Sequence, residues 1–284
     1  MLSSLIIVFR EVIEAGLIIG IVLAATKGVA RRSWWVGFGI AAGVAGACLV
    51  AAFASQIGEM FQGSGQELFN ATVLLLAVAM LTWHNVWMAS HGREIAREMR
   101  AVGAAVTAGN RTLTALAVVV GVAVLREGSE VVLFLYGIVA QGGTSAASLV
   151  GGGALGLLAG ATVSALMYFG LLSIPAHRLF AVTGWLITLL AAGMASQAVL
   201  FIQNAGYLQV WMMPLWDTSW LLPEGGEGIA GIIGRMLHTL VGYSDQPNGA
   251  QLTAYVATIV AINILMRVVN RPRQLPPAVP AAAE

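Results

Sequence analysis

Arg10-Glu11-Val12-Ile13-Glu14 lies inside an apolar run that extends from Leu5 to Ala25, and a second copy, Arg126-Glu127-Gly128-Ser129-Glu130, lies inside the apolar run from Ala115 to Ala140. Each ionised side chain near the centre of a bilayer costs about 2.5–3.5 kcal/mol, so a membrane helix keeps such residues only when they have partners or a purpose. In a helix the arginine and both glutamates of one copy share a face, because residues three and four positions apart are neighbours. Each copy is therefore a stripe of two carboxylates and one guanidinium group.

The composition of the chain is that of a polytopic membrane protein. Its 284 residues are 58% hydrophobic and 10% charged, and the mean hydropathy is +0.85, whereas soluble domains contain about 25% charged residues. The N-terminal apolar run has no basic region before it and contains three charged residues, so we expect a retained first helix rather than a cleaved signal peptide. The one cysteine, Cys48, excludes an intramolecular disulfide.

Seven segments have the length of about 20 apolar residues that a membrane span needs, and they lie at roughly 4–26, 34–55, 67–88, 113–140, 148–172, 179–202 and 251–269. The Lys- and Arg-rich connections all fall on one side, which the positive-inside rule makes cytoplasmic. The N-terminus is then outside and the C-terminus inside. The sequence predicts an all-α permease domain over residues 1–269 in the inner (plasma) membrane, with a disordered cytoplasmic tail over 270–284.

The connections on the outer side are acidic. They contain Arg235 as their one cation and six acids: Glu59, Glu67, Asp217, Glu224, Glu227 and Asp245. Such a face attracts cations, and we expect Glu67 and Asp217 to guide them toward the outer mouth. The long outer connection, residues 203–250, includes the apolar segment 228–241. At about 14 residues this segment is too short to span, and we interpret it as an interfacial or re-entrant helix.

A long-period repeat relates the two halves of the chain. Val36-Gly37-Phe38-Gly39 resembles Val150-Gly151-Gly152-Gly153, and the charged motif also occurs once in each half. Repeat one covers residues 1–90, repeat two covers 113–202, and the helix 251–269 is additional. Because each repeat has three spans, the copies are inserted in opposite senses, which gives an inverted repeat. The two motifs are then expected to meet near the midplane, bringing together Glu11, Glu14, Glu127 and Glu130, with Arg10 and Arg126 supporting them.

Four converging carboxylates form an all-oxygen ligand set, which suits ferric iron, manganese, calcium or magnesium better than copper or zinc. A structural cluster of ion pairs would need only one Arg–Glu pair, whereas each motif has a second carboxylate. A proton-conducting subunit that uses the same carboxylates is a further alternative. For His84 and His91, seven residues apart on one helical face, we expect an interfacial role. The chain has no metalloprotease, nucleophile-elbow, Walker or dinucleotide motif, so we do not expect an enzyme.

The doubled Arg-Glu-x-x-Glu motif, in the first and fourth of seven spans, resembles the signature of the oxidase-dependent iron transporter family, the high-affinity iron permeases of fungi and bacteria. The likeness extends over most of the chain, through Gln66-Glu67-Leu68-Phe69, Leu81-Thr82-Trp83, Trp216-Asp217, Gly242-Tyr243 and Pro247. The sequence departs from the family pattern at Val12, where many members have glycine, and at Asn70, where members often have a second acid near Glu67.

This resemblance implies iron import, with the four motif glutamates as the metal site and iron as the transported substrate. It also implies a separate extracytoplasmic oxidase or iron-binding protein that delivers the iron. Without the resemblance, the residues indicate a cation transporter with a carboxylate site, and a permease for another metal, such as lead or manganese, stays open. Neither a permanently bound cofactor nor a nucleic-acid partner is expected.

Overall fold

The structure is a computed structural model that describes residues 1–60, 65–141, 145–170, 176–224 and 228–269. Secondary structure within these residues is helical, apart from an isolated bridge between Pro214 and Asn248. The helices are α1 (Leu2–Ala25), α2 (Arg32–Met60), α3 (Gln66–Thr107), α4 (Thr114–Gln141), α5 (Ala146–Tyr168), α6 (Ala176–Asn204), α7 (Ile229–Val241) and α8 (Gly249–Val269). The predicted all-α class is confirmed, while the predicted tail, 270–284, lies outside the described residues.

Among the described residues, five helical segments are long and apolar enough to cross a membrane: 32–54, 66–88, 146–168, 181–204 and 249–269. Large apolar side chains on their outer surfaces are exposed, for example Leu49 and Phe53 on α2 and Leu158 on α5. Lipid is the environment that suits such a surface. Helices α1 and α4 reach 24 and 28 residues, but each contains the three charged residues of its motif. The chain is a multi-pass membrane protein, and the number of seven spans stays a prediction.

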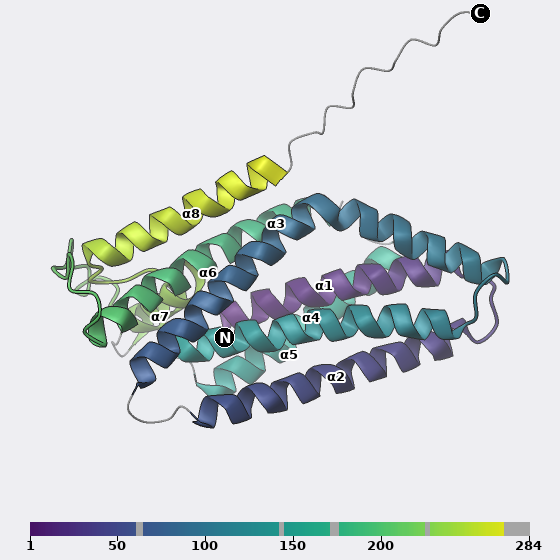
Figure 1. Ribbon diagram of the computed structural model, residues 1–284, viewed down its shortest axis with the longest axis horizontal. Coiled ribbons are helices and arrows are strands. Elements are labelled where there is room, and N and C mark those ends of the chain that lie inside the picture. The colour runs from purple at the N-terminus through teal and green to yellow at the C-terminus, as the bar shows by residue number, and fades with distance from the viewer. Residues whose placement is uncertain (61–64, 142–144, 171–175, 225–227, 270–284) are drawn as a thin grey trace, which may run out of the picture.

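Helix α3 differs most from the sequence-based expectation, because it continues 19 residues beyond the segment 67–88 and ends at Thr107. The continuation is charged and therefore ends the apolar segment, yet it is rich in Ala, Arg and Glu, which favour helix. Figure 1 shows that α3 bends in its middle. The predicted end of repeat one, residue 90, thus lies inside a helix.

The helices of the two halves pair crosswise. Helix α1 packs along α5, and α2 packs along α4, while α3 packs against α6 (Figure 1). Glycines bring the backbones of these pairs into contact. A Cβ atom added to Gly156 of α5 would lie 2.5 Å from the carbonyl oxygen of Leu5, and one added to Gly43 of α2 would lie 2.7 Å from that of Gly121. Each motif helix is consequently paired with the second helix of the other half.

Two apolar clusters lie on opposite sides of the motif residues. The larger one includes Ile7 of α1, Leu81 of α3 and Phe134 of α4, which are fully buried, and it continues into α6 and α8. The smaller one joins the far ends of α1 to α4 and consists of Val22, Val36, Val106, Leu116 and Val120. The charged motifs therefore occupy a layer between two apolar layers.

The apolar segment 228–241 forms the short helix α7, whose end is close to the middle of α6, where an added Cβ at Gly193 would lie 2.5 Å from Gly242 Cα. Acids hold this connection together. The backbone N–H of Asp245 donates to Glu224 Oε1 at 2.9 Å, and that of Glu224 donates to Asp245 Oδ2 at 3.2 Å. His238 Nδ1 lies 3.3 Å from Glu224 Oε1. These acids are thus engaged in local contacts, while Glu227 and the side chain of Glu59 lie outside the described residues.

Candidate metal centre

The first motif forms a compact charged stripe on α1. Arg10 Nη1 lies 3.1 Å from Glu11 Oε1, and Arg10 Nη2 lies 3.0 Å from Glu14 Oε1. All three residues are at most 3% exposed. The apolar residues on both sides of the motif allow only helix in a membrane, because every backbone group must be satisfied within the segment. One guanidinium group therefore holds two buried carboxylates in place.

The second motif has the same spacing but a different arrangement. Arg126 Nε lies 3.2 Å from Glu130 Oε1 and 3.7 Å from Glu127 Oε1. Its guanidinium carbon lies 4.4 Å from the ring centroid of Trp87, a cation–π contact, and the side chain is 35% exposed. Glu127 is buried and its Oε2 atom accepts no hydrogen bond. The second motif thus leaves a buried carboxylate oxygen unpartnered.

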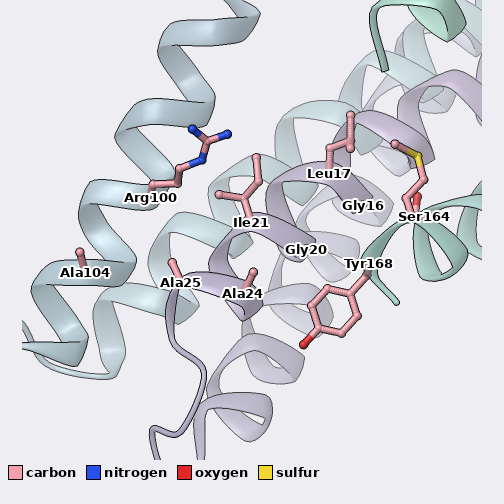
Figure 2. Close-up of a pocket in the computed structure, with 11 residues that line it drawn as sticks. Gly16, Leu17, Gly20, Ile21, Ala24, Ala25, Arg100, Ala104, Ser164 and Tyr168 are labelled. Carbon is pink, nitrogen blue, oxygen red and sulfur yellow. The ribbon is translucent and has the colours of Figure 1, made fainter. Parts of the chain in front are cut away.

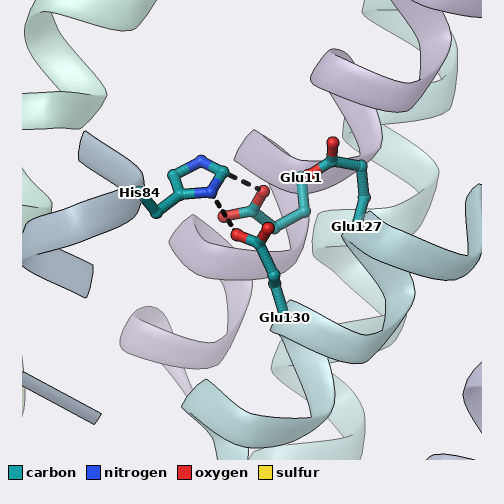
Figure 3. A group of neighbouring side chains, drawn as sticks. All are labelled: Glu11, His84, Glu127 and Glu130. Atoms are coloured by element: carbon teal, nitrogen blue, oxygen red, sulfur yellow. Dashed lines mark ion pairs between the residues drawn. The ribbon is translucent and has the colours of Figure 1, made fainter. Parts of the chain in front are cut away.

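His84 of α3 joins the two motifs. Its Nε2 atom lies 3.4 Å from Glu14 Oε2. The same atom lies 3.8 Å from Glu11 Oε2, and its Nδ1 atom is paired with Glu130 (Figure 3). His84 is only 4% exposed. Its ring packs edge-on against Phe134 at 6.5 Å between centroids. Its neighbour Asn85 donates to the carbonyl oxygen of Gly184 and to Thr188, and so fixes this part of α3 against α6.

Four side chains converge closely enough to hold one ion. Glu11, His84, Glu127 and Glu130 each offer one ligand atom, and these atoms lie within 4.8 Å of one another (Figure 3). They come from three helices and from both halves of the chain. Three carboxylate oxygens and one imidazole nitrogen are hard to borderline ligands that suit divalent manganese, iron or zinc.

The charge of the motifs also favours a cation. Four glutamates against two arginines leave a formal charge of −2 when His84 is neutral. Buried carboxylates that keep this excess need a counter-charge. A divalent cation supplies it without a further side chain.

The structure brings glutamates of the two motifs together. It does not bring Glu67 or Asp217 to this centre. Glu67 lies at the start of α3, 17 residues before His84, which is about 25 Å along a helix. Asp217 is exposed and accepts hydrogen bonds from the hydroxyl and the N–H of Ser219, which lower its pKa.

The expectation of an interfacial role for His84 is wrong. Helix α3 continues beyond the predicted boundary at residue 88, so His84 lies within the helix rather than at its end, and its side chain is buried. One sequence signal could have found it. An imidazole inside an apolar run is as anomalous as a carboxylate there, and such residues face the interior of a bundle.

Comparison with known proteins supplies the family. Residues 1–271 match the model of the Iron permease FTR1 family. The chain belongs to the iron permease FTR1 family. This permease is 29% identical over 266 residues to the ferrous iron permease EfeU of Escherichia coli O6:K15:H31, with 92% of this chain and 93% of that protein covered. It is 28% identical over 271 residues to EfeU of Yersinia pestis, with 93% of each covered. No solved structure matches it.

Membership of the FTR1 family confirms the resemblance inferred from the doubled motif. The match extends over nearly all of the described helices, so the family relationship concerns the whole permease rather than one segment. The family is one of transporters, not enzymes, and its substrate is iron.

Proposed function

We propose that this FTR1-family permease imports iron across the inner (plasma) membrane through the centre formed by Glu11, His84, Glu127 and Glu130. The observation that carries the proposal is the convergence of four buried ligand atoms within 4.8 Å, contributed by both halves of the chain. Glu14 contacts Arg10 and His84 and adds a fourth carboxylate charge to the site. An ion that binds here exchanges its water for carboxylate oxygens and one imidazole nitrogen.

The ligand set supports ferrous iron as the substrate. The sequence alone predicts only oxygen ligands, which favour ferric iron, manganese, calcium or magnesium. The imidazole of His84 shifts this preference toward borderline divalent ions. The curated relatives are named ferrous iron permeases. A competition uptake assay with Mn²⁺ and Pb²⁺ tests this assignment, because a permease for either metal would take up that ion in preference to Fe²⁺.

The proposed topology has seven spans in two inverted three-helix repeats, with the N-terminus outside and the C-terminus in the cytoplasm. The crosswise pairing of α1 with α5 and of α2 with α4 supports it, because exchanging the two halves turns one pair into the other. The Lys and Arg residues in the connections after α1 and in the second half of α3 support the orientation. An extracytoplasmic oxidase or iron-binding protein remains the proposed donor of iron.

In the proposed mechanism, the arginines hold the glutamates ionised and positioned while the centre is empty. Arg10 does so from a buried position between Glu11 and Glu14. The incoming ion replaces this compensation at the unpartnered oxygen atoms, among them Glu127 Oε2. The two repeats then move against each other to expose the centre to the cytoplasm, as in other transporters with inverted repeats.

The test is uptake of radioactive iron by cells that express single variants at matched membrane abundance. Glu11→Gln, Glu14→Gln, Glu127→Gln and Glu130→Gln should each reduce uptake to the level of cells without the permease. Ser129→Ala is the matched control, because Ser129 lies in the second motif but donates its hydroxyl to the carbonyl oxygen of Leu125. Normal uptake in all four glutamine variants would exclude this site. Altered proton flux with normal iron uptake would instead indicate a proton-conducting subunit.

A further inference from the structure

A cavity of about 490 Å³ extends from the metal centre along α3 and α4. At one end it is lined by Arg126 and Glu127 of the second motif. On its α3 side it is lined by Trp87, His91, Glu94 and Glu98, which recur along one face of the helix. The α4 wall is apolar, with Val118, Val119, Val122 and Ala123.

Glu127 lines the inner end of this cavity and has a carboxylate oxygen that lacks a hydrogen-bond partner. Glu127 is 3% exposed, and its Oε2 atom accepts no hydrogen bond. Glu94 and Glu98 at the other end are exposed. The cavity therefore connects a buried carboxylate of the centre with two carboxylates in the charged half of α3, at the end that the Arg-rich connections assign to the cytoplasm.

A second cavity, of about 610 Å³, offers a direct comparison (Figure 2). It lies between the second half of α1, the last turns of α3 and the end of α5. Among the described residues, its lining contains Arg100 and no acid, and no motif residue belongs to it. A cation entering this larger cavity would meet a positive charge, whereas the smaller cavity offers it carboxylates.

Arg126 lies where the centre meets the smaller cavity. Its guanidinium group stacks on Trp87, and the Trp87 ring stacks on His91 with 5.2 Å between centroids and 15° between planes. The same guanidinium group contacts Glu127 and Glu130. A cation that leaves the centre toward Glu94 must pass this positive group, so Arg126 is placed to separate the centre from the cavity.

The opposite side of the centre is closed by apolar packing. Ile7, Leu81 and Phe134 lie on that side and are fully buried. Phe134 contacts the imidazole of His84 directly. The centre thus has an apolar seal toward the proposed outer face and a carboxylate-lined cavity toward the proposed cytoplasmic face.

We propose that the cavity between α3 and α4 is the cytoplasmic exit route for the divalent cation, with Arg126 on Trp87 as its inner gate and Glu94 and Glu98 as the residues that receive the ion. This inference rests on the proposed function of the centre. Along this route the ion only exchanges ligands: carboxylate oxygens at each end of the cavity replace part of its hydration shell. The structure is accordingly that of a permease closed to the outside.

Filling the cavity tests the route. Val119→Trp places a large side chain in the cavity between α3 and α4, and Ala104→Trp places the same side chain in the larger cavity as the matched control. Val119→Trp should abolish iron uptake in proteoliposomes while the purified protein still binds Fe²⁺ with the stoichiometry of the unmodified permease. Ala104→Trp should leave both unchanged. Normal uptake by Val119→Trp, or equal loss in the two variants, would overturn the route.

The receiving carboxylates have a separate test. Glu94→Gln combined with Glu98→Gln should reduce the rate of uptake roughly tenfold at low ionic strength, because local carboxylates concentrate cations. The loss should shrink at high salt, where exposed charges are screened. A purely structural role for the two acids would give a loss that does not depend on salt.

If Val119→Trp does not reach the membrane, labelling of an introduced cysteine tests the exit route instead. In a Cys48→Ser background, Val122→Cys introduces a thiol into the cavity, and Leu49→Cys introduces one of similar exposure on the lipid-facing surface of α2. A membrane-impermeant maleimide should label Val122→Cys from the cytoplasmic side in inside-out vesicles and leave Leu49→Cys unlabelled, because the reactive thiolate forms in water. Absence of label at Val122→Cys would overturn the route.

Failure of the route and failure of the centre are distinguishable. If Glu11→Gln abolishes uptake while Val119→Trp transports normally, the centre stands and the route is wrong. If all four glutamine variants and Val119→Trp transport normally, the proposed function of the centre itself is wrong.

Discussion

At the scale of residues, the two motif arginines differ although their sequence context is nearly the same. The side chain of Arg10 is 3% exposed and holds two carboxylates, whereas that of Arg126 is 35% exposed and rests on Trp87. A buried ion pair adds little net stability, but removing one partner leaves an uncompensated charge. Arg10 is therefore enclosed by its two carboxylate partners, whereas Arg126 also lines the cavity between α3 and α4.

This difference predicts unequal stability losses. Arg10→Gln should destabilise the permease by about 3–5 kcal/mol, the cost of breaking a buried pair. Arg126→Gln should cost about 1 kcal/mol or less, because its contacts are partly solvated. Thermal unfolding of the two purified variants in the same detergent, without added metal, measures both. Equal shifts of the two melting temperatures would contradict the assignment.

His84 supplies the one nitrogen atom among the four candidate ligands, and its loss should change the metal preference. Removing a residue that only hydrogen-bonds a metal ligand typically weakens metal binding roughly 10–100-fold. His84→Gln removes a candidate ligand itself, so it should weaken Fe²⁺ binding by more than that. Mg²⁺ and Ca²⁺ should compete better than before, since only oxygen ligands remain. Competition binding to purified protein measures this change. His91→Gln is the control, because His91 lies on the same helix but outside the cluster. An unchanged order of metals would exclude His84 as a ligand.

At the scale of elements, glycine decides how closely the helix pairs approach. Gly156 of α5 faces the backbone of α1, whereas Gly151 in the same helix has open space at the position of its Cβ. Backbone atoms cannot rotate away as a side chain can. The pairing of α1 with α5 thus depends on particular glycines rather than on a general apolar surface.

Gly156→Ala should therefore force the two helices apart and destabilise the protein by about 1–3 kcal/mol, the usual cost of overpacking. Gly151→Ala should be neutral or slightly stabilising, because alanine favours helix by about 1 kcal/mol over glycine. Thermal unfolding of both variants in detergent gives the comparison. A loss at Gly151→Ala as large as that at Gly156→Ala would show that the close approach is not the cause.

The stability contributed by the contact between His238 of α7 and Glu224 should depend on pH. Burial lowers the pKa of His238, but the hydrogen bond and charge of Glu224 outweigh this effect and hold the pKa above its ordinary value of 6.5. Burial raises the pKa of Glu224, and the contact with His238 outweighs that, so this pKa lies below its ordinary 4.5. The pair consequently stabilises the fold fully between pH 4.5 and 6.5.

His238→Gln should lower the melting temperature most in that window, by the equivalent of about 0.5–1 kcal/mol. The difference from the unmodified protein should vanish as the pH rises through the raised pKa of His238, where the histidine loses its charge. It should also vanish as the pH falls through the lowered pKa of Glu224. Melting curves of both proteins across this range measure the effect, and a constant difference would contradict the pair.

At the scale of the whole molecule, the sequence predicted the all-α, multi-pass class of the protein. Six charged residues in apolar runs indicated a layer of charge in which Arg10 to Glu14 and Arg126 to Glu130 meet. Helices α1 and α4, which carry the two motifs, do lie together, while the seven spans and the inverted repeat stay predictions. These features were accessible because the cost of charge in lipid and the periodicity of a helix act on every residue in the same way.

The sequence did not predict the features that depend on the length and bending of α3 and on which of its faces meets α4. The position of His84 requires knowing that α3 continues to Thr107 and bends, which a hydropathy pattern cannot show. The contact of Arg126 with Trp87 requires knowing which face of α3 meets α4. Glu67 and Asp217 were predicted from charge alone to guide cations toward an outer mouth, and this role stays a prediction.

The crosswise pairing of α1 with α5 and of α2 with α4 has a consequence for how the protein folds. A three-helix half on its own would leave its motif helix without the helix that packs along it, and it would supply only part of the converging carboxylates. The charged layer is therefore expected to assemble only after the second half has been synthesised.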